Sequence, residues 1–257
     1  MNKDKYWAKA NIHNLTALWR AAGAAPLEHV EHVEHVEHVE HGTESATLYG
    51  SSRWPFRHWF ETDTPLPDNR ELRSILGDLP ATAMVPVWGE NRDLQAALSA
   101  TGFERCLNQQ AMYLTLADWR PTSNNPALQL RPVQFAGEVQ TWVTVCSEAF
   151  GYRIDTAVIA GLAAHQDTRL WLAEIDGVAV ATALLFRTGE VTGVHQVGVP
   201  ERFRGRGIAR ELMQALLARC QQSGAGRVTL QASEMGEGLY RQLGFTPQFP
   251  IFSYRRP

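Results

Sequence analysis

Residues 197–212 hold the densest set of side chains and glycines that could do chemistry. An apolar segment ends at Pro200, Gly205 and Gly207 follow, and a segment with helical apolar spacing begins at Ile208. The first turn of a helix has unpaired N–H groups and a partial positive charge. A glycine has no Cβ, so a bulky anion can come close to those N–H groups. The segment therefore predicts a strand, a loop and a helix start that cradle a pyrophosphate group.

Two arginines, Arg204 and Arg206, add cationic charge to this loop. Two other phosphate-binding loops do not fit. A Walker loop needs a Gly-Lys pair, and the chain contains none. A dinucleotide-binding loop needs a third glycine three residues after Gly207, where Arg210 stands.

The run from Arg204 to Ala209, R-G-R-G-I-A, resembles the acyl-CoA loop Q/R-x-x-G-x-G/A of the GNAT superfamily of N-acetyltransferases. The resemblance covers about residues 127–257. It implies a mixed α/β fold whose splayed central sheet is flanked by helices, with acetyl-CoA as co-substrate. The residues that would bind the acetyl-CoA pyrophosphate are Arg204, Gly205, Arg206, Gly207, Ile208, Ala209 and Arg210. Those whose backbone would hold pantetheine and polarise the thioester carbonyl are Val197, Gly198 and Val199.

A second motif lies downstream, where Leu239-Tyr240 and Gly244-Phe245 resemble the L-Y-x-x-x-G-F signature of the same family. The resemblance implies that the Tyr240 hydroxyl protonates the leaving thiolate. A tyrosine that packs its ring and hydrogen-bonds its hydroxyl is the structural alternative.

Two positions depart from the family pattern. Ser233 stands where an asparagine often contacts the cofactor, and it still offers a hydroxyl. Gly193 stands where the family has a glutamate base. His195, two residues on and so on the same strand face, is the substitute we select, although a histidine satisfied by a backbone partner is an open alternative. Glu174, a water chain, or no base at all are the others.

Composition narrows the class of protein. The chain has 257 residues, a formal net charge of −3 and 44% hydrophobic residues, which fits one large or two small globular domains. This charge predicts no partner among nucleic acids or anionic membranes. We find no signal-peptide pattern and no run of about 20 apolar residues, and three scattered cysteines suit a reducing compartment. We therefore expect a cytoplasmic protein.

The two halves of the chain share a local layout. Residues 91–103 and 233–245 both predict a short helix that ends in Gly-Phe before a strand. We therefore predict two tandem GNAT-like halves: a degenerate one at 1–125, with Leu98 in place of the tyrosine and no R-G-x-G loop, and a catalytic one at 126–257. A simple helix stop followed by a core aromatic is the alternative.

Residues 28–41 repeat the triplet Glu-His-Val and place a histidine at every third position. We interpret the tract as a low-complexity surface segment and predict no metal site. A histidine edge that holds Zn²⁺ or Ni²⁺ remains the alternative.

These patterns predict an acetyl-CoA-dependent N-acetyltransferase that acts by direct transfer on a small-molecule or peptide amine. Tyr240 and His195 would be its catalytic residues and Ser233 a further cofactor contact. A non-catalytic acyl-CoA sensor or interaction module is the second hypothesis. The acceptor amine and the oligomeric state, including a homodimer, stay open.

Overall fold

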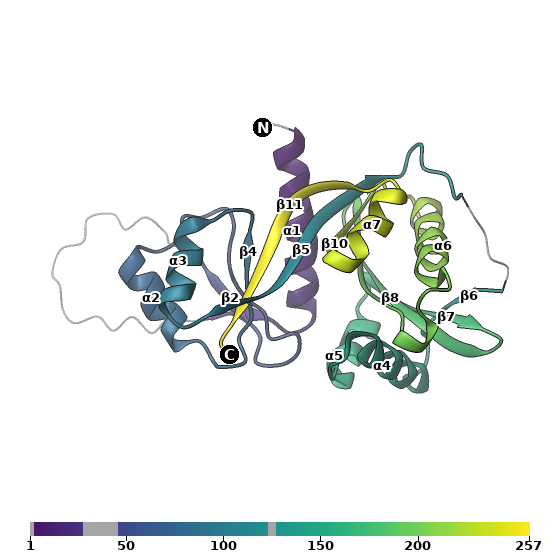
Figure 1. Ribbon diagram of the computed structural model, residues 1–257, viewed down its shortest axis with the longest axis horizontal. Coiled ribbons are helices and arrows are strands. Elements are labelled where there is room, and N and C mark those ends of the chain that lie inside the picture. The colour runs from purple at the N-terminus through teal and green to yellow at the C-terminus, as the bar shows by residue number, and fades with distance from the viewer. Residues whose placement is uncertain (1–2, 28–45, 123–126) are drawn as a thin grey trace. The chain divides into compact units, whose positions relative to one another are not determined.

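The computed structural model describes residues 3–27, 46–122 and 127–257 (Figure 1). They form two compact units. The first holds the chain up to residue 22 and residues 109–249, and the second holds residues 23–108 and 250–257. The Glu-His-Val tract, and with it the question of a metal there, lies outside the described residues.

The first unit contains a six-membered run of strands in the order β5-β10-β9-β8-β7-β6. Their bounds are β5 Glu104–Thr115, β6 Gln129–Pro132, β7 Thr168–Ile175, β8 Val178–Thr188, β9 Val191–Gly198 and β10 Arg227–Ser233. Among these neighbours β9 and β10 pair parallel and the other pairs are antiparallel. This is the mixed sheet that the sequence predicts.

The β7–β8 hairpin follows from two residues. Asp176 and Gly177 form its turn with φ values of 50° and 74°. A two-residue turn with positive φ at both positions matches the twist of the strands that it joins, and Asp-Gly is a preferred pair for it. The hairpin predicted at Asp176-Gly177 is confirmed.

Helices cover both faces of this sheet. They are α1 Lys3–Ala21, α4 Ala136–Phe150, α5 Thr156–Ala164, α6 Ile208–Gln222 and α7 Glu234–Gln242. Val194 of β9 packs into a core cluster with Leu212 and Leu216 of α6. The next residue, His195, contacts Asn14 of α1. Since successive side chains of a strand point to opposite faces, α6 and α1 lie on opposite faces of β9.

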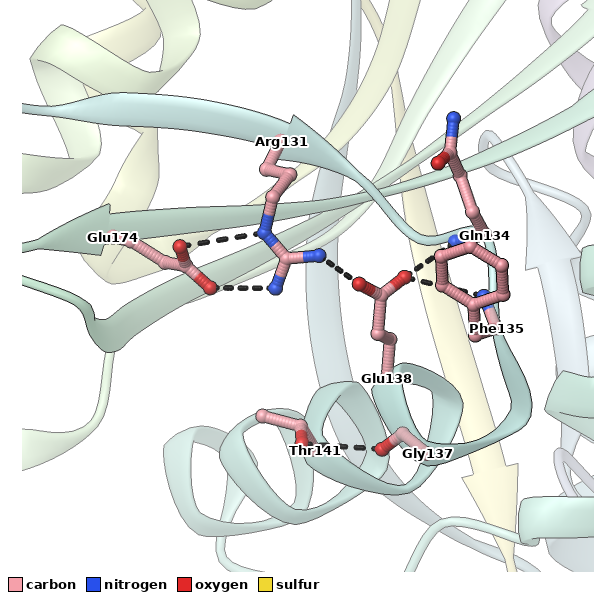
Figure 2. Close-up of polar contacts among 7 residues, drawn as sticks. All are labelled: Arg131, Gln134, Phe135, Gly137, Glu138, Thr141 and Glu174. Atoms are coloured by element: carbon pink, nitrogen blue, oxygen red, sulfur yellow. Dashed lines mark hydrogen bonds and ion pairs between the residues drawn. The ribbon is translucent and has the colours of Figure 1, made fainter.

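The start of α4 is held by an ion-pair chain (Figure 2). Glu138 accepts hydrogen bonds from the backbone N–H groups of Gln134 (2.6 Å) and Phe135 (3.2 Å). These bonds, the one from Gln134 first, lower the pKa of Glu138. Arg131 of β6 bridges Glu138 to Glu174 of β7, with 2.7 Å between Arg131 Nη2 and Glu174 Oε1. The chain fixes α4 against the β6–β7 edge.

The second unit is smaller. Its antiparallel sheet has the order β1-β2-β3, with bounds Ala25–Pro26, Leu48–Gly50 and His58–Phe60. It also holds α2 (Asn69–Asp78), β4 (Val85–Trp88) and α3 (Arg92–Ala100). The end of β11 (Thr246–Arg255) pairs antiparallel with β4. Apolar side chains of α2, α3 and β4 form its core.

A β-α-β motif occurs once in each unit, and the two copies exchange their last strands. Both helices end in a glycine of positive φ followed by a buried phenylalanine. The N–H of Phe103 donates to Leu98 O and that of Phe245 to Tyr240 O, both at 3.0 Å. The strand after α3 is β5, which pairs with β10, whereas the strand after α7 is β11, which pairs with β4. The repeat predicted from Gly-Phe is thus present locally.

The rest of the second unit does not reproduce the first, because β1, β2 and β3 form a separate antiparallel sheet. The boundary predicted between residues 125 and 126 also differs from the division into compact units, since α1 and the end of β5 belong to the first unit. Two complete tandem GNAT-like halves therefore stay a prediction. Within the described part of the chain, no helix is both long and apolar enough to span a bilayer.

Candidate functional site

The strands β9 and β10 part midway. They pair at Val191–Arg227, Thr192–Val228 and Gly193–Thr229, whereas β9 continues to Gly198 and β10 to Ser233. The described register holds no further pair between them. Backbone N–H and C=O groups on this side of β9 after Gly193 therefore face a gap, as the resemblance predicts.

A bulge reorients β9 beside this gap. Thr182 pairs with Gly198 and Leu184 with His195, so β9 has one extra residue between these pairs. Gln196 lies there with a φ of 51°, and its carbonyl accepts from Thr182 Oγ1 at 3.1 Å. A bulge twists a strand and changes the direction of the residues that follow. It thus sets the direction of Val197 and Gly198, the backbone predicted to hold the thioester.

Gly198 meets another constraint than the one predicted. A Cβ on this residue would lie 2.9 Å from Ala149 Cβ and 3.1 Å from a Phe150 ring carbon. The close approach at this glycine is therefore made by the end of α4.

The predicted glycine loop connects β9 to α6. A 3₁₀ turn spans Glu201–Phe203, and Gly205 and Gly207 have φ values of 75° and 74°. A Cβ on either glycine would meet nothing within 4 Å, so the space beside them is open. Gly207 is the N-cap of α6 and its carbonyl accepts from the N–H of Arg210 and Glu211. The N–H groups of Ile208 and Ala209 precede these bonds and are the groups a helix start offers to an anion.

The three arginines of this segment differ in their contacts. Arg204 donates to the carbonyls of Val199 (3.0 Å) and Ala149 (2.8 Å), so it fastens the loop to the end of α4. Arg210 donates to Gln242 Oε1 and connects α6 with α7. Arg206 is exposed, and its described contact is with the Phe203 ring, 5.9 Å from the ring centroid. Arg206 is thus the one best placed to act as a solvent-facing cation.

Tyr240 and Ser233 lie on α7 and at its start. Ser233 Oγ accepts from the N–H of Gly236 at 3.3 Å and caps the helix. Tyr240 is half-buried with its ring edge-on to Phe245, at 5.8 Å between centroids. Burial raises the pKa of Tyr240 to about 12, so its hydroxyl keeps its proton at neutral pH. A protonated hydroxyl is what an acid for a leaving thiolate requires.

His195 is buried, with 7% of its surface exposed, and its Nε2 lies 3.1 Å from Asn14 Oδ1. Burial lowers the pKa of His195 to about 4, and a hydrogen bond with the Gln231 side chain partly opposes this. The imidazole is therefore neutral at pH 7. Its described partner is a side chain of α1, so the backbone partner considered as an alternative is not the one that the structure shows.

The position of the family glutamate has no room for a side chain. A Cβ on Gly193 would lie 1.9 Å from Asn14 Oδ1 and 2.2 Å from His195 Nε2. Glu174, the other carboxylate considered, is held by Arg131 (Figure 2) on β7, two strands from β9 in the sheet order. Among the described residues no group of three or more His, Cys, Asp or Glu side chains could hold a metal.

Asn14 was not predicted as a site residue. Its signal in the sequence is faint: Asn11 and Asn14 stand three residues apart, on one face of a helix whose neighbours there are apolar. Both are buried, with 1% and 0% exposure. A buried asparagine needs hydrogen-bond partners, and here these come from strands more than 90 residues away in sequence.

Residues 138–245 match the family described as Acetyltransferase (GNAT) family. This chain carries a GNAT acetyltransferase domain. The match includes the splayed strands, the glycine loop and Tyr240, and it confirms the family and the acetyltransferase class that the sequence resemblance implies. No curated protein matches the sequence significantly.

Solved structures agree on the fold. A GCN5-related N-acetyltransferase from Kribbella flavida is 18% identical, with a TM-score of 0.69 over 97% of this chain and 95% of its own. One from Sphaerobacter thermophilus is also 18% identical, with a TM-score of 0.60 over 86% and 84%. A region described as a GCN5-related glucosamine N-acetyltransferase, within a fungal multi-domain beta-N-acetylglucosaminidase, is 12% identical, with a TM-score of 0.59 over 82% and 31%.

Proposed function

We propose that the chain transfers the acetyl group of acetyl-CoA directly to an amine of a small molecule or peptide. One observation carries the proposal: β9 and β10 stop pairing at Gly193, and β9 leads straight into a glycine loop that caps α6. A gap between strands offers backbone groups to an extended amide-containing chain such as pantetheine. The helix start offers N–H groups to the pyrophosphate.

The same arrangement supplies the chemistry. In our proposal the amine nitrogen attacks the thioester carbon while a backbone N–H in the Val197 to Val199 segment stabilises the developing oxyanion. The carbon–sulfur bond then breaks, and the thiolate takes the proton of Tyr240. The high pKa of Tyr240 supports this role, because the hydroxyl remains protonated over the whole neutral range.

Ser233 and Arg204 take indirect parts in this proposal. Ser233 caps α7, so it orients the helix that carries Tyr240, and Arg204 fastens the glycine loop. Arg206 is the cation that we assign to the pyrophosphate. We also propose the cytoplasm as the location, since all three cysteines are free thiols.

A turnover assay tests the proposal. The purified chain is incubated with acetyl-CoA and a panel of amino acids, peptides and amino sugars, the last because one structural neighbour is described as a glucosamine N-acetyltransferase region. Released CoA thiol and the acetylated amine are measured together. We expect equal amounts of both with at least one amine class. Acetyl-CoA binding without turnover on any amine would instead favour the sensor hypothesis.

Replacement of the proposed acid makes the test specific. Tyr240→Phe removes only the hydroxyl, so we expect kcat to fall about 100-fold while acetyl-CoA affinity stays unchanged. Tyr113→Phe, on β5 of the same unit, removes a hydroxyl away from the gap and should keep kcat. Full activity of Tyr240→Phe would show that the acid is another group.

A further inference from the structure

The amide of Asn14 has a fixed orientation. Its Nδ2 donates to Phe186 O at 3.0 Å and to Thr188 Oγ1 at 2.9 Å, which uses both of its N–H bonds. The backbone carbonyl is a pure acceptor, so the amide cannot be turned around without losing that bond. Asn14 Oδ1 must therefore face His195 Nε2, at 3.1 Å.

This orientation selects one form of the imidazole. A neutral histidine has one N–H and one bare nitrogen. An oxygen acceptor at 3.1 Å from Nε2 requires the proton to be on Nε2. The bare nitrogen is then Nδ1, which can accept a proton.

A second chain of amides anchors the other side of the cluster. Asn11 Nδ2 donates to Met112 O at 3.1 Å and to Gln248 Oε1 at 2.6 Å. Asn11 Oδ1 accepts from Gln231 Nε2 at 2.8 Å, and the Gln231 side chain is hydrogen-bonded to His195. Helix α1 is thus tied to β5, β10 and β8 around the imidazole, at the level where β9 and β10 part.

The groups that face the imidazole are uncharged. They are Asn14 from α1, Gln231 from β10 and Leu184, its pairing partner on β8. From α4, Cys146 contacts the adjacent Gln196, and burial raises the pKa of its thiol to about 12. No charged side chain is among the causes of the His195 pKa shift, so burial dominates and the imidazole remains unprotonated at neutral pH.

We infer that Asn14 is a positioning residue for acetyl transfer: it holds His195 as the Nε2–H tautomer, so that Nδ1 receives the amine proton, directly or through water. The inference rests on the proposed function. The amine electron pair forms the new C–N bond, the C–S pair leaves with sulfur, the amine proton goes to Nδ1, and the thiolate takes the Tyr240 proton. Once Nδ1 is protonated, the Nε2–H bond to Asn14 becomes charge-assisted.

The test combines a spectroscopic and a kinetic readout on the full chain. Two-bond ¹⁵N–¹H correlations of labelled wild-type protein should show His195 as the Nε2–H tautomer, and in Asn14→Leu this preference should be lost. The wild-type profile of kcat/KM against pH should have an acid limb due to His195. In Asn14→Asp a carboxylate replaces the amide oxygen, so this limb should move to higher pH by about 1 unit or more.

Thr16→Val is the matched control, because Thr16 is buried on the same helix and its hydroxyl bonds only to His13 O within that helix. Its pH profile and His195 tautomer should equal those of the wild type. An Nδ1–H tautomer in the wild type, or an acid limb that stays in place in Asn14→Asp, overturns the role of Asn14 while turnover persists. If the wild type acetylates no amine, the proposed function fails, and the proton-acceptor role fails with it even where the tautomer is as expected.

Discussion

Gly193 and Asn14 occupy the same space from opposite sides: a Cβ on Gly193 would lie 1.9 Å from Asn14 Oδ1. The absence of a side chain on β9 is thus matched by the presence of one on α1. Where the family pattern has a glutamate on the strand, this chain has a glycine and fills the space with an amide from its N-terminal helix. The two residues therefore depend on each other.

We expect Gly193→Ala to destabilise the first unit by about 1–3 kcal/mol, since the added methyl overlaps Asn14 and His195 and neither can move without losing hydrogen bonds. Urea unfolding measures the change. Gly226→Ala is the control, because a Cβ on that exposed residue would meet only Glu190 O at 3.9 Å. Equal stability of Gly193→Ala and the wild type would contradict the dependence on Asn14.

Local signals in the sequence were sufficient for many elements. The helix predicted at residues 136–150 has the bounds of α4, and Asp176-Gly177 forms the predicted hairpin turn. The loop at Gly205 and Gly207 precedes a helix as predicted. In each case the deciding interactions, a turn with positive φ or a helical apolar stripe, lie within a few residues of one another.

Three features depended on contacts that no short window of sequence contains. Helix α5 was missed, because Thr156–Ala164 is apolar nearly throughout and has no helical period; its Asp155 cap, which accepts from the N–H of Ala157, was the available signal. The exchange of β5 and β11 joins distant segments. The buried amides of α1 find partners more than 90 residues away. Such pairings are decided by tertiary packing.

The strand predicted over residues 53–60 is also shorter than expected. The chain turns first, with Phe56 N–H donating to Arg53 O at 2.7 Å, and β3 begins only at His58. Aromatic residues at strand spacing suggested an extended segment, and a local turn replaced its first half.

The glycine loop allows a comparison of two glycines on one helix. Gly207 and Gly224 lie at the start and just beyond the end of α6, with φ values of 74° and 78°, and a Cβ on either meets nothing within 4 Å. An alanine in this conformation costs roughly 1–2 kcal/mol. We expect both Gly→Ala variants to lose similar stability in thermal unfolding, but only Gly207→Ala to weaken acetyl-CoA binding in calorimetry, by about tenfold or more. Equal affinities would move the cofactor away from this loop.

Arg204 and Arg206 should respond differently to lysine. Arg204 donates to two carbonyls at once, which a lysine ammonium cannot reproduce in the same geometry, so Arg204→Lys should raise the KM for acetyl-CoA although the charge is kept. Arg206→Lys keeps the exposed charge and should change KM little. Arg206→Ala should raise KM and weaken its dependence on salt, because a screened charge contact is lost. Steady-state kinetics at low and high ionic strength separate the cases, and a tolerant Arg204→Lys would show that its charge alone matters.

The burial of His195 predicts a stability change in acid. Its folded pKa of about 4 lies below the ordinary value of 6.5, so the unfolded chain binds the proton first as the pH falls. This contribution to folding stability is fully present above about pH 6.5 and is lost as the pH falls toward about 4, a loss of roughly 3 kcal/mol from this one group. His195→Gln should lack this part of the pH dependence. The pKa of His58 is also lowered by burial, so the free energies of unfolding of His195→Gln and His58→Gln are each compared with the wild type from pH 7 to 4. Parallel curves for His195→Gln and the wild type would mean that His195 is solvated in the folded protein.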